Sequence, residues 1–344
     1  MIQLQCDYNE GAHPLIMKKL METNLEQTVG YGEDDYCANA RKLILDACQC
    51  PQAQVHFLVG GTQTNTTVIA HILKSYQGAI AAETGHINVH ETGAIENTGH
   101  KVLALPSTDG KLTARQVEEA LEAHRTDCNF EHMVQPGIVY ISFPTEVGTL
   151  YSHQELKELH SVCQRYDIPL FIDGARLGYG LCSPQCNVTL AQLAACCDVF
   201  YIGGTKVGAL FGEAVVITNP ALQKDFRYSI KQHGGMLAKG RLLGLQFETL
   251  FTDRLYWKIS ENAIHQAMRI KLVVEEKGYP FFMESPTNQQ FPIFPDEVLQ
   301  KLSEHFLFSF WEKTDETHTA VRICTSWATT TEQVDQLIAE LKEI

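Results

Sequence analysis

The chain has 344 residues, of which 44% are hydrophobic and 20% are charged, a composition typical of a soluble globular protein long enough for two domains. Its formal net charge of −14 argues against nucleic acid and anionic membrane as partners, because phosphate binding needs clustered Lys and Arg. The start MIQLQCDYNEGAHP lacks the pattern of a signal peptide, no apolar run is long enough to cross a bilayer, and the eleven cysteines form no matched CxxC pairs, which predicts a cytoplasmic protein with free thiols and no metal site.

Residues 1–30 are predicted to form an N-terminal arm with one helix at 13–23, where apolar residues recur on a single face. In the loop that follows, Tyr31 lies between two glycines. It is expected either to stack on a ligand or to pin the arm to a neighbour. A second helix is predicted at 35–49, starting at an acidic cap.

A strand at 55–59 ends in Gly-Gly-Thr, and a helix is predicted from there to about residue 75. Gly61 and Thr62 bring free amide groups and a hydroxyl to a helix start, which suits a phosphate group. Ordinary helix capping is the alternative. The segment lacks the GxGxxG spacing of dinucleotide-binding folds and the GK[ST] of NTPases, which argues against both.

Strands and helices then alternate at a spacing that indicates right-handed crossovers and a largely parallel sheet. We expect a three-layer α/β/α domain at 31–240 with a mostly parallel, seven-stranded sheet. The strand at 214–218 follows without an intervening helix, so it is expected to be antiparallel. The other predicted elements are strands at 79–82, 101–105, 138–143 and 169–173 and helices at 113–124 and 152–166.

Two polar residues follow predicted strand ends, where ligands collect in open α/β sheets. His86, just past the strand at 79–82, can stack on an aromatic cofactor and exchange protons, although a structural histidine is the alternative. Asp173 ends the strand at 169–173, and Arg176 follows three residues later. A carboxylate there can hold a proton on a pyridine-like nitrogen; the alternative is a helix N-cap.

The segment DVFYIGGTKVGALFG contains Lys206 after two glycines and Thr205. Apolar surroundings lower the pKa of a lysine and leave a nucleophilic amine. The alternative is a lysine whose head reaches water while its stem lies on apolar surface. Together with Asp173, Lys206 supplies the two parts of a pyridoxal phosphate site: an amine that forms a carbon–nitrogen double bond and an anion that keeps the ring nitrogen protonated.

A smaller α+β domain is predicted at 241–344, after the glycine-rich basic segment KQHGGMLAKGR and a long helical tract that breaks near Asp253. Arg322 lies alone among apolar residues in AVRICTSW. A lone arginine on a strand is costly to bury without an anion. It is therefore expected to bind a substrate carboxylate or to form an internal salt bridge.

The motifs GGTQTN, TGHIN, TEVG, FIDGARL and GGTKVGALFGEAVV occur in this order. In this order, and with an arginine in the C-terminal domain, they resemble the low-specificity threonine aldolases, in particular the phenylserine aldolase branch, over nearly the whole chain. These enzymes belong to the aspartate aminotransferase-like, fold type I pyridoxal phosphate enzymes, in the aromatic amino acid beta-eliminating lyase/threonine aldolase group.

The resemblance implies a role for each matching residue. Lys206 would form the Schiff base, Asp173 would pair with the ring nitrogen, and His86 would lie over the ring face and take the proton of the substrate β-hydroxyl. Arg176 would lie near the phenolic oxygen and the substrate carboxylate, which Arg322 would clamp. The phosphate would be held by Gly61, Thr62 and Thr205.

Members of this family resemble dimers of dimers. The resemblance therefore also implies a homodimer or homotetramer with sites at the subunit interface. Lys231, Lys239 or Arg241 would then reach the phosphate of a neighbouring subunit. Cys6 precedes Asp7 where the family usually carries Ser-Asp, so Cys6 is a candidate contact of the substrate carboxylate. TEVG replaces the Asn-Thr-containing loop of many threonine aldolases, which leaves the preferred β-substituent open.

The predicted reaction is retro-aldol cleavage of threonine, allo-threonine or phenylserine to glycine and an aldehyde. Two enzymatic alternatives on the same scaffold are a β-eliminating lyase and a transaminase, which break other bonds. An alternative of another class is a cofactor-binding protein without turnover.

Overall fold

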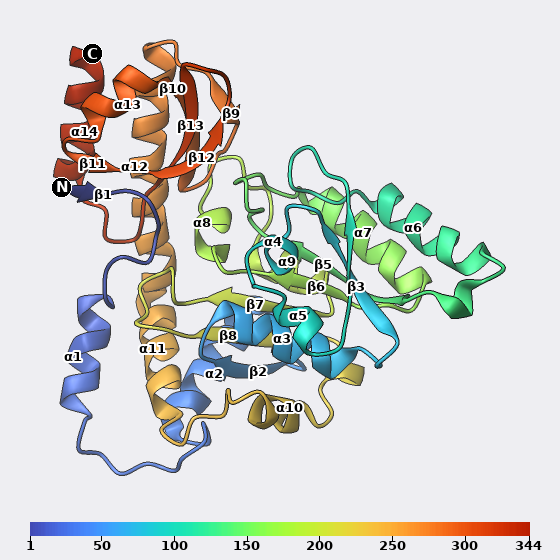
Figure 1. Cartoon of the computed structure of the whole chain (residues 1–344). Coiled ribbons are helices and arrows are strands. Elements are labelled where there is room, and N and C mark those ends of the chain that lie inside the picture. The colour runs from blue at the N-terminus through green and yellow to red at the C-terminus, as the bar shows by residue number, and fades with distance from the viewer.

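The computed structural model describes residues 1–344, and a seven-stranded sheet forms its centre (Figure 1). The strand order is β2-β8-β7-β6-β5-β3-β4. All strands run in one direction except β8, which is antiparallel to both neighbours. This confirms the predicted sheet and its single reversed strand. The bounds are β2 Gln54–Leu58, β3 Gln77–Ala82, β4 Val102–Leu105, β5 Gln135–Ser142, β6 Leu170–Asp173, β7 Val199–Gly203 and β8 Glu213–Ile217.

Helices cover both faces of this sheet, so alternate residues of each strand are buried on opposite sides. Along β7, Phe200 and Ile202 face one apolar cluster and Val199 and Tyr201 face the other. The first cluster takes residues from α2 (Asp35–Cys48), α7 (His153–Arg165), α9 (Leu190–Ala195) and α11 (Arg241–Phe251). The second takes residues from α3 (Gly61–Ile72), α5 (Ala94–Asn97) and α10 (Phe226–Gln232). The predicted three layers are therefore present.

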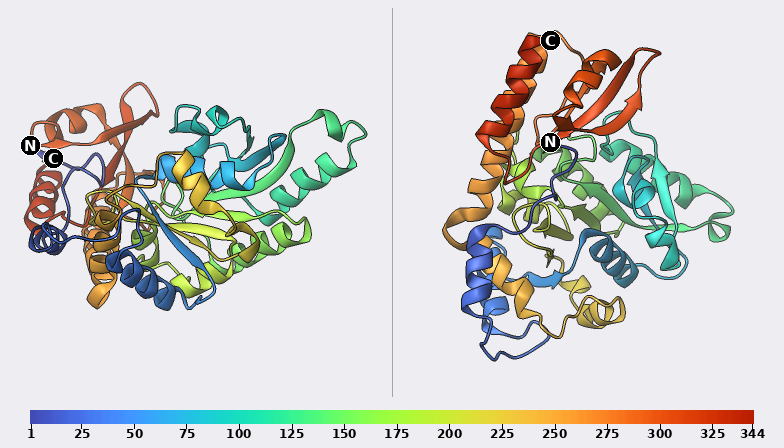
Figure 2. Two further views of the ribbon diagram at one scale, coloured as in Figure 1. Left: turned by 90° about the horizontal axis from the view of Figure 1, so that it is seen from below. Right: turned by 60° about the vertical axis from the view of Figure 1, so that its left-hand side comes forward.

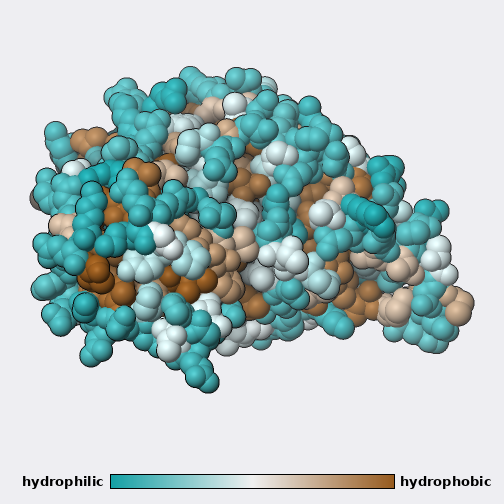
Figure 3. Space-filling model, turned by 90° about the horizontal axis from the view of Figure 1, so that it is seen from above, coloured by the Kyte–Doolittle hydropathy of each residue, from teal (hydrophilic) through white to brown (hydrophobic).

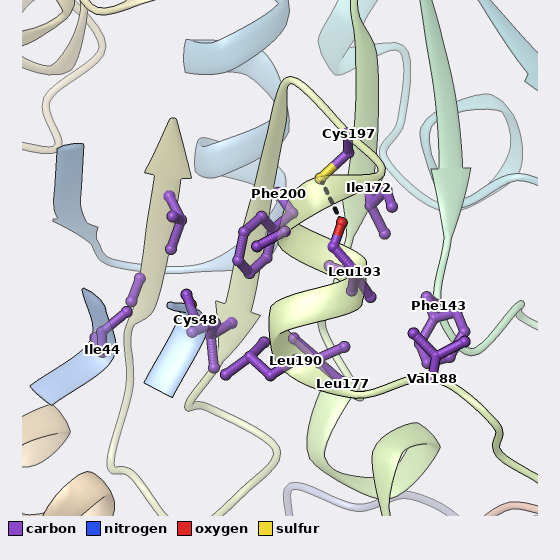
Figure 4. Close-up of a cluster of buried hydrophobic side chains, with 14 of the residues drawn as sticks. Ile44, Cys48, Phe143, Ile172, Leu177, Val188, Leu190, Leu193, Cys197 and Phe200 are labelled. Carbon is purple, nitrogen blue, oxygen red and sulfur yellow. Dashed lines mark hydrogen bonds between the residues drawn. The ribbon is translucent and has the colours of Figure 1, made fainter. Parts of the chain in front are cut away.

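Part of the first cluster is drawn in Figure 4, where Phe200 and Ile172 from the sheet, Leu193 of α9 and Cys48 of α2 are among the side chains shown. The thiol of Cys197 donates to the carbonyl oxygen of Leu193 at 3.3 Å. All eleven cysteines are unpaired. The other helices around the large sheet are α4 (His86–Val89), α6 (Ala114–Thr126), η1 (Phe130–His132), α8 (Leu177–Leu181) and η2 (Pro220–Leu222).

The last third of the chain builds a second, antiparallel sheet in the order β12-β13-β10-β9. Its core packs against α12 and α14. The helical tract before it breaks at Asp253, where φ is +50°, near the predicted position. The bounds are η3 Thr252–Arg254, α12 Leu255–Glu276, β9 Phe281–Met283, β10 Gln289–Pro295, α13 Asp296–Leu302, β11 Phe306–Leu307, β12 Ser309–Lys313, β13 His318–Cys324 and α14 Thr331–Glu343.

The N-terminal arm contains a short strand that the sequence analysis did not predict. β1 (Ile2–Gln3) pairs in parallel with β11, and α1 (Pro14–Glu22) follows it and lies along α11. Both marked chain ends accordingly lie on the side of the small sheet (Figures 1 and 2). The arm is thus tied to the small sheet, while the boundaries at residues 30 and 240 stay a prediction.

Hydrophilic atoms cover most of the face shown in Figure 3, with separate apolar areas between them. Large apolar side chains that are exposed include Leu25, Val29, Tyr31 and Tyr228. None of the helices combines the length and the apolar character needed to span a bilayer.

Candidate active site

The polar residues predicted from sequence meet at the carboxyl edge of the large sheet, around a cavity of about 330 Å³. The parallel strands β2, β7, β6, β5 and β3 all end at this edge, and β8 begins there because it runs the other way. In spatial order the edge carries Gly61 and Thr62 after β2, Glu213 at the start of β8, Thr205 and Lys206 after β7, Asp173 and Arg176 at β6, Ser142 and Glu146 at β5, and His86 after β3. Ligand binding outside strand ends is the rule for open α/β sheets.

Asp173 is fully buried and accepts hydrogen bonds on both oxygens. Tyr140 donates to Oδ2 at 2.6 Å, Tyr201 donates to Oδ1, and the amide of Ala175 donates to Oδ1 at 3.0 Å. Burial alone would raise the pKa of Asp173, but the charge of His86 and the two tyrosine hydrogen bonds outweigh it and lower the pKa. The carboxylate is therefore ionised. The next helix begins after Arg176, which rules out the helix N-cap alternative for Asp173.

Lys206 lies in the turn after β7, and two glycines bring this turn close to neighbouring backbone. A Cβ on Gly203 would lie 2.2 Å from the carbonyl oxygen of Ala175, and one on Gly204 would lie 2.7 Å from that of Gly212. The Lys206 ammonium forms no ion pair, and it lies 5.9 Å from the centroid of the Tyr8 ring. Burial, followed by the charge of Arg176, lowers the pKa of Lys206, as the sequence analysis predicts for a nucleophilic amine.

His86 is held by a buried carboxylate. Its Nδ1 lies 2.8 Å from Oε1 of Glu91, whose side chain is 0% exposed. Burial lowers the pKa of His86, but the hydrogen bond that its ring donates to Glu91 and the charges of Asp173 and Glu91 outweigh it, so the pKa is raised. With Nδ1 occupied, Nε2 is the ring nitrogen left for a ligand in the cavity.

Arg176 forms a bidentate ion pair with Asp7 at 2.7 and 3.0 Å. Burial alone would raise the pKa of Asp7, but Arg176, Lys206 and the amide of Asn288 hold it at about 2. Asp7, which the sequence analysis did not select, thus belongs to the site. Its neighbour Cys6 does not line the cavity, and the Cys6 thiol bonds Oδ1 of Asn9 at 3.0 Å.

Arg322 lies outside the lining of the cavity and forms no ion pair. Its guanidinium donates to the carbonyl oxygen of Gln5 at 2.9 Å and, more weakly, to Gln289 and Ser309 at 3.4 Å. Its Nε is buried without a partner. The internal salt bridge considered for Arg322 is therefore absent, and the carboxylate contact stays a prediction.

The basic residues expected to reach a neighbouring subunit differ in their surroundings. Lys231 and Lys239 are exposed and do not line the cavity of their own chain, and the Lys231 ammonium lies 5.1 Å from the centroid of the Tyr31 ring. Arg241 donates at 2.7 Å to the carbonyl oxygen of Thr23 in its own arm. Arg241 is therefore committed to its own chain, which leaves the two lysines as candidates.

The residues present fit pyridoxal phosphate. A Cβ on Gly60 would meet nothing within 4 Å, so there is open space where α3 begins, and the first amides of a helix have no partner within it. The buried anion Asp173 and the unpaired amine of Lys206 face the same cavity. No group of three or more His, Cys, Asp or Glu side chains is arranged to hold a metal ion.

Several residues that line the cavity or bond to its lining were missed by the sequence analysis. Glu213 accepts from the amide of Gly204 at 3.0 Å, and burial raises the pKa of Glu213 to about 8. Tyr140 and Ser142 are two residues apart along β5, so this period of two was an available signal that their polar groups share a side. Asn65, on α3, had no such signal.

This fold and this set of side chains define a pyridoxal phosphate-dependent enzyme of the aspartate aminotransferase-like type. The family model described as "Beta-eliminating lyase" matches residues 4–292. The chain belongs to this family of lyases and, within it, to the threonine aldolases.

Two relatives carry that assignment. A solved threonine aldolase of Leishmania major is 42% identical, with a TM-score of 0.97 over 100% of this chain and 99% of that one. A low-specificity L-threonine aldolase of a Pseudomonas species is 29% identical over 99% of this chain and 97% of its own. A structure from Exiguobacterium, described as a putative aromatic amino acid beta-eliminating lyase/threonine aldolase, is 17% identical over 100% of this chain and 97% of that one, with a TM-score of 0.73, and it shows the shared fold.

Proposed function

We propose that this enzyme cleaves a β-hydroxy-α-amino acid of the threonine type into glycine and an aldehyde. The observation that carries the proposal is that His86, oriented by Glu91, lines the same cavity as Lys206 and Asp173. A group able to move a proton thus lies beside the amine and the anion that the cofactor requires. Threonine cleavage is also the activity named for the two relatives.

Pyridoxal phosphate, when bound, supplies an electron sink for the bond that breaks at Cα. Lys206 would hold it covalently, and Asp173 would keep its ring nitrogen protonated. Gly61, Thr62 and Thr205 would hold its phosphate.

The two arginines would orient the substrate through its carboxylate. Arg322 supports this role because its charge has no anionic partner within the chain, and Arg176 supports it because it lines the cavity beside Lys206. Fixing the carboxylate also fixes which bond at Cα is aligned for cleavage, and orientation of this kind can contribute several kcal/mol. His86, directly or through a water, would take the proton of the β-hydroxyl.

The natural substrate is proposed to be threonine, allo-threonine or phenylserine. The protein is proposed to be cytoplasmic, in line with its unpaired thiols.

We also propose that two subunits build each site, in a homodimer or homotetramer. The cations that line the cavity are Lys206, Arg176 and His86; the first holds the cofactor and the second is paired with Asp7. A phosphate dianion would then need a further cation, which the exposed Lys231 and Lys239 of a neighbouring subunit could supply. The exposed Tyr31 and Tyr228 beside them would suit a subunit contact.

The deciding experiment mixes the purified protein with pyridoxal phosphate and L-threonine. We expect acetaldehyde and glycine in equal amounts, and a borohydride-stable cofactor adduct on Lys206 by mass spectrometry. Ammonia without acetaldehyde would instead support β-elimination, and conversion of added pyruvate to alanine would support transamination. An adduct without any product would support a cofactor-binding protein.

A further inference from the structure

Glu146, in the TEVG segment after β5, lines the cavity. One of its carboxylate oxygens accepts hydrogen bonds from other residues, and the other does not. Its Oε1 accepts from the hydroxyl of Ser142 at 2.6 Å and from the backbone amide of His86 at 2.9 Å. No other residue donates to its Oε2, and the side chain lines the cavity. The carboxyl group is therefore positioned by two donors while one oxygen remains open to a ligand.

The strand order places Glu146 at a particular end of the site. β5 lies between β6, which ends in Asp173, and β3, which leads to His86. Glu213, the other carboxyl group of the lining without an assigned role, is on β8, beyond β7 and on the phosphate side of Lys206. Glu146 thus shares the His86 end of the cavity, where the substrate β-carbon would lie.

We propose that Glu146 contacts the β-hydroxyl of the substrate and accepts its proton, with His86 beside it as the second contact of that hydroxyl. This inference rests on the proposed function. It changes one step of that function: Glu146 instead of His86 accepts the hydroxyl proton, and His86 remains a contact of the hydroxyl. It also gives the TEVG segment a role in recognising β-hydroxy amino acids.

The step balances without any further reactant. The hydroxyl proton passes to Oε2 of Glu146, and the O–H electron pair becomes the second bond of the aldehyde C=O. The Cα–Cβ pair stays with Cα, which then takes up a proton. Threonine thereby yields acetaldehyde and glycine.

The surroundings make Glu146 a stronger base than an ordinary carboxylate. Burial raises its pKa, and the charge of Asp173 adds to this, against the hydrogen bonds from Ser142, from its own backbone amide and from the amide of His86, which lower it. The pKa of His86 is also raised, so the imidazole holds a proton for a larger share of the time near neutral pH. A protonated imidazole can bind the hydroxyl oxygen but cannot accept the proton, whereas a neighbouring carboxylate can.

The test uses Glu146→Gln in the holoenzyme, because the Gln carbonyl can still accept from Ser142 and His86 while it cannot take a proton. Two reactions are compared: acetaldehyde release from L-threonine, and exchange of the glycine α-hydrogen in D₂O followed by proton NMR. Glycine lacks the β-hydroxyl. We expect cleavage to fall by about 10²-fold, with glycine exchange unchanged within about twofold. Glu213→Gln makes the same chemical change on the other side of Lys206 and should leave the ratio of the two rates unchanged.

A binding measurement provides a readout that does not depend on turnover. L-serine and L-alanine differ only in the β-hydroxyl, and their dissociation constants are obtained by titrating the holoenzyme in a calorimeter. We expect the preference for serine to fall at least threefold in Glu146→Gln, since a charge-assisted hydrogen bond is lost. Should this variant fail to fold, Glu146→Asp, which shortens the side chain and keeps its charge, is expected to give a smaller loss in cleavage alone.

The proposal is overturned if cleavage and glycine exchange fall together, which would indicate a supporting role for Glu146, or if neither changes. Wild-type protein that exchanges the glycine hydrogen but releases no acetaldehyde would instead overturn the proposed function. The two failures are therefore distinguishable.

Discussion

Asn65 joins the two carboxylates that govern the cofactor ring and the proton-transfer end of the site. Its Nδ2 donates to Oε1 of Glu91 at 2.7 Å and to Oδ2 of Asp173 at 3.0 Å. Glu91 in turn holds Nδ1 of His86. A single amide on α3 thus links Asp173, at the end of β6, with Glu91, in the loop after α4, and the ionisation of each group depends on the others.

Replacing Glu91 by Gln should lower the pKa of His86. The hydrogen bond from the His86 ring to Glu91 and the charge of Glu91 both raise that pKa, and the Gln amide removes the charge. The measurement is a proton NMR titration of the His86 ring in cofactor-free protein. Glu96→Gln, at an exposed site on the same segment, serves as the control; an unchanged His86 pKa in Glu91→Gln would contradict the assigned contact.

Replacing Asp7 by Asn should destabilise the protein by about 3 kcal/mol at pH 7, because it leaves Arg176 buried without its partner. The folded-state pKa of Asp7 is about 2, below the value of about 3.9 for an unfolded aspartate. Ionised Asp7 therefore stabilises the fold above about pH 4, and this contribution is lost as the pH falls from about 4 towards 2.

The check on Asp7 is the free energy of unfolding in urea at pH 7 and at pH 3. The difference between wild type and Asp7→Asn should shrink at the lower pH. Asp335→Asn breaks the exposed pair with Arg269, where we expect less than about 1 kcal/mol. Equal effects of the two substitutions would contradict the role of burial.

At the scale of elements, the turns that leave β6 and β7 are packed against each other at the sheet edge. A Cβ on Gly174, after β6, would lie 1.9 Å from the carbonyl oxygen of Tyr201 in β7. The close packing of these turns brings Asp173 and Lys206 to one cavity. Glycine is required at this point because no side chain fits there.

Gly174→Ala should therefore lower the thermal midpoint of the cofactor-free protein by several degrees, since backbone would have to shift to relieve the overlap. Gly60→Ala is the matched control, because its Cβ meets nothing within 4 Å and its φ of −168° is extended. A thermal midpoint of Gly174→Ala within one degree of wild type would show that the close contact with Tyr201 does not require glycine at this position.

At the scale of the whole molecule, the cavity takes its lining from the large sheet and from the N-terminal arm through Tyr8. The arm reaches this position because β1 pairs with β11 of the small domain and Asp7 pairs with Arg176. Residues more than 150 positions apart in the chain thus meet at one site. The lysines proposed for the phosphate are exposed and do not line this cavity, so sharing between subunits can be tested directly.

Subunits carrying Lys206→Ala and subunits carrying Lys231→Ala with Lys239→Ala should each be inactive alone. Co-expressed, they should recover about a quarter of wild-type cleavage, since half of the dimers are mixed and one of their two sites has both wild-type contributions. Light scattering must show the same oligomer in every sample. Mixed oligomers without recovered activity would contradict a shared site.

The sequence by itself determined the residues whose chemistry is set by local context. Alternating strands and helices predicted the parallel sheet. Asp173 and His86 were selected because they lie at strand ends, where such sheets bind ligands, and Lys206 was selected for its apolar surroundings after two glycines. Their chemical type and position along the chain were sufficient for that.

Only the tertiary structure decided which of these groups are neighbours. The pairing of Asp7 with Arg176 and the link through Asn65 depend on strand order and on where the arm docks, which no local pattern encodes. The same holds for the free oxygen of Glu146 beside His86: β5 is hydrogen-bonded to β3 and β6, and that pairing follows from the packing of the whole domain rather than from the residues of any one segment.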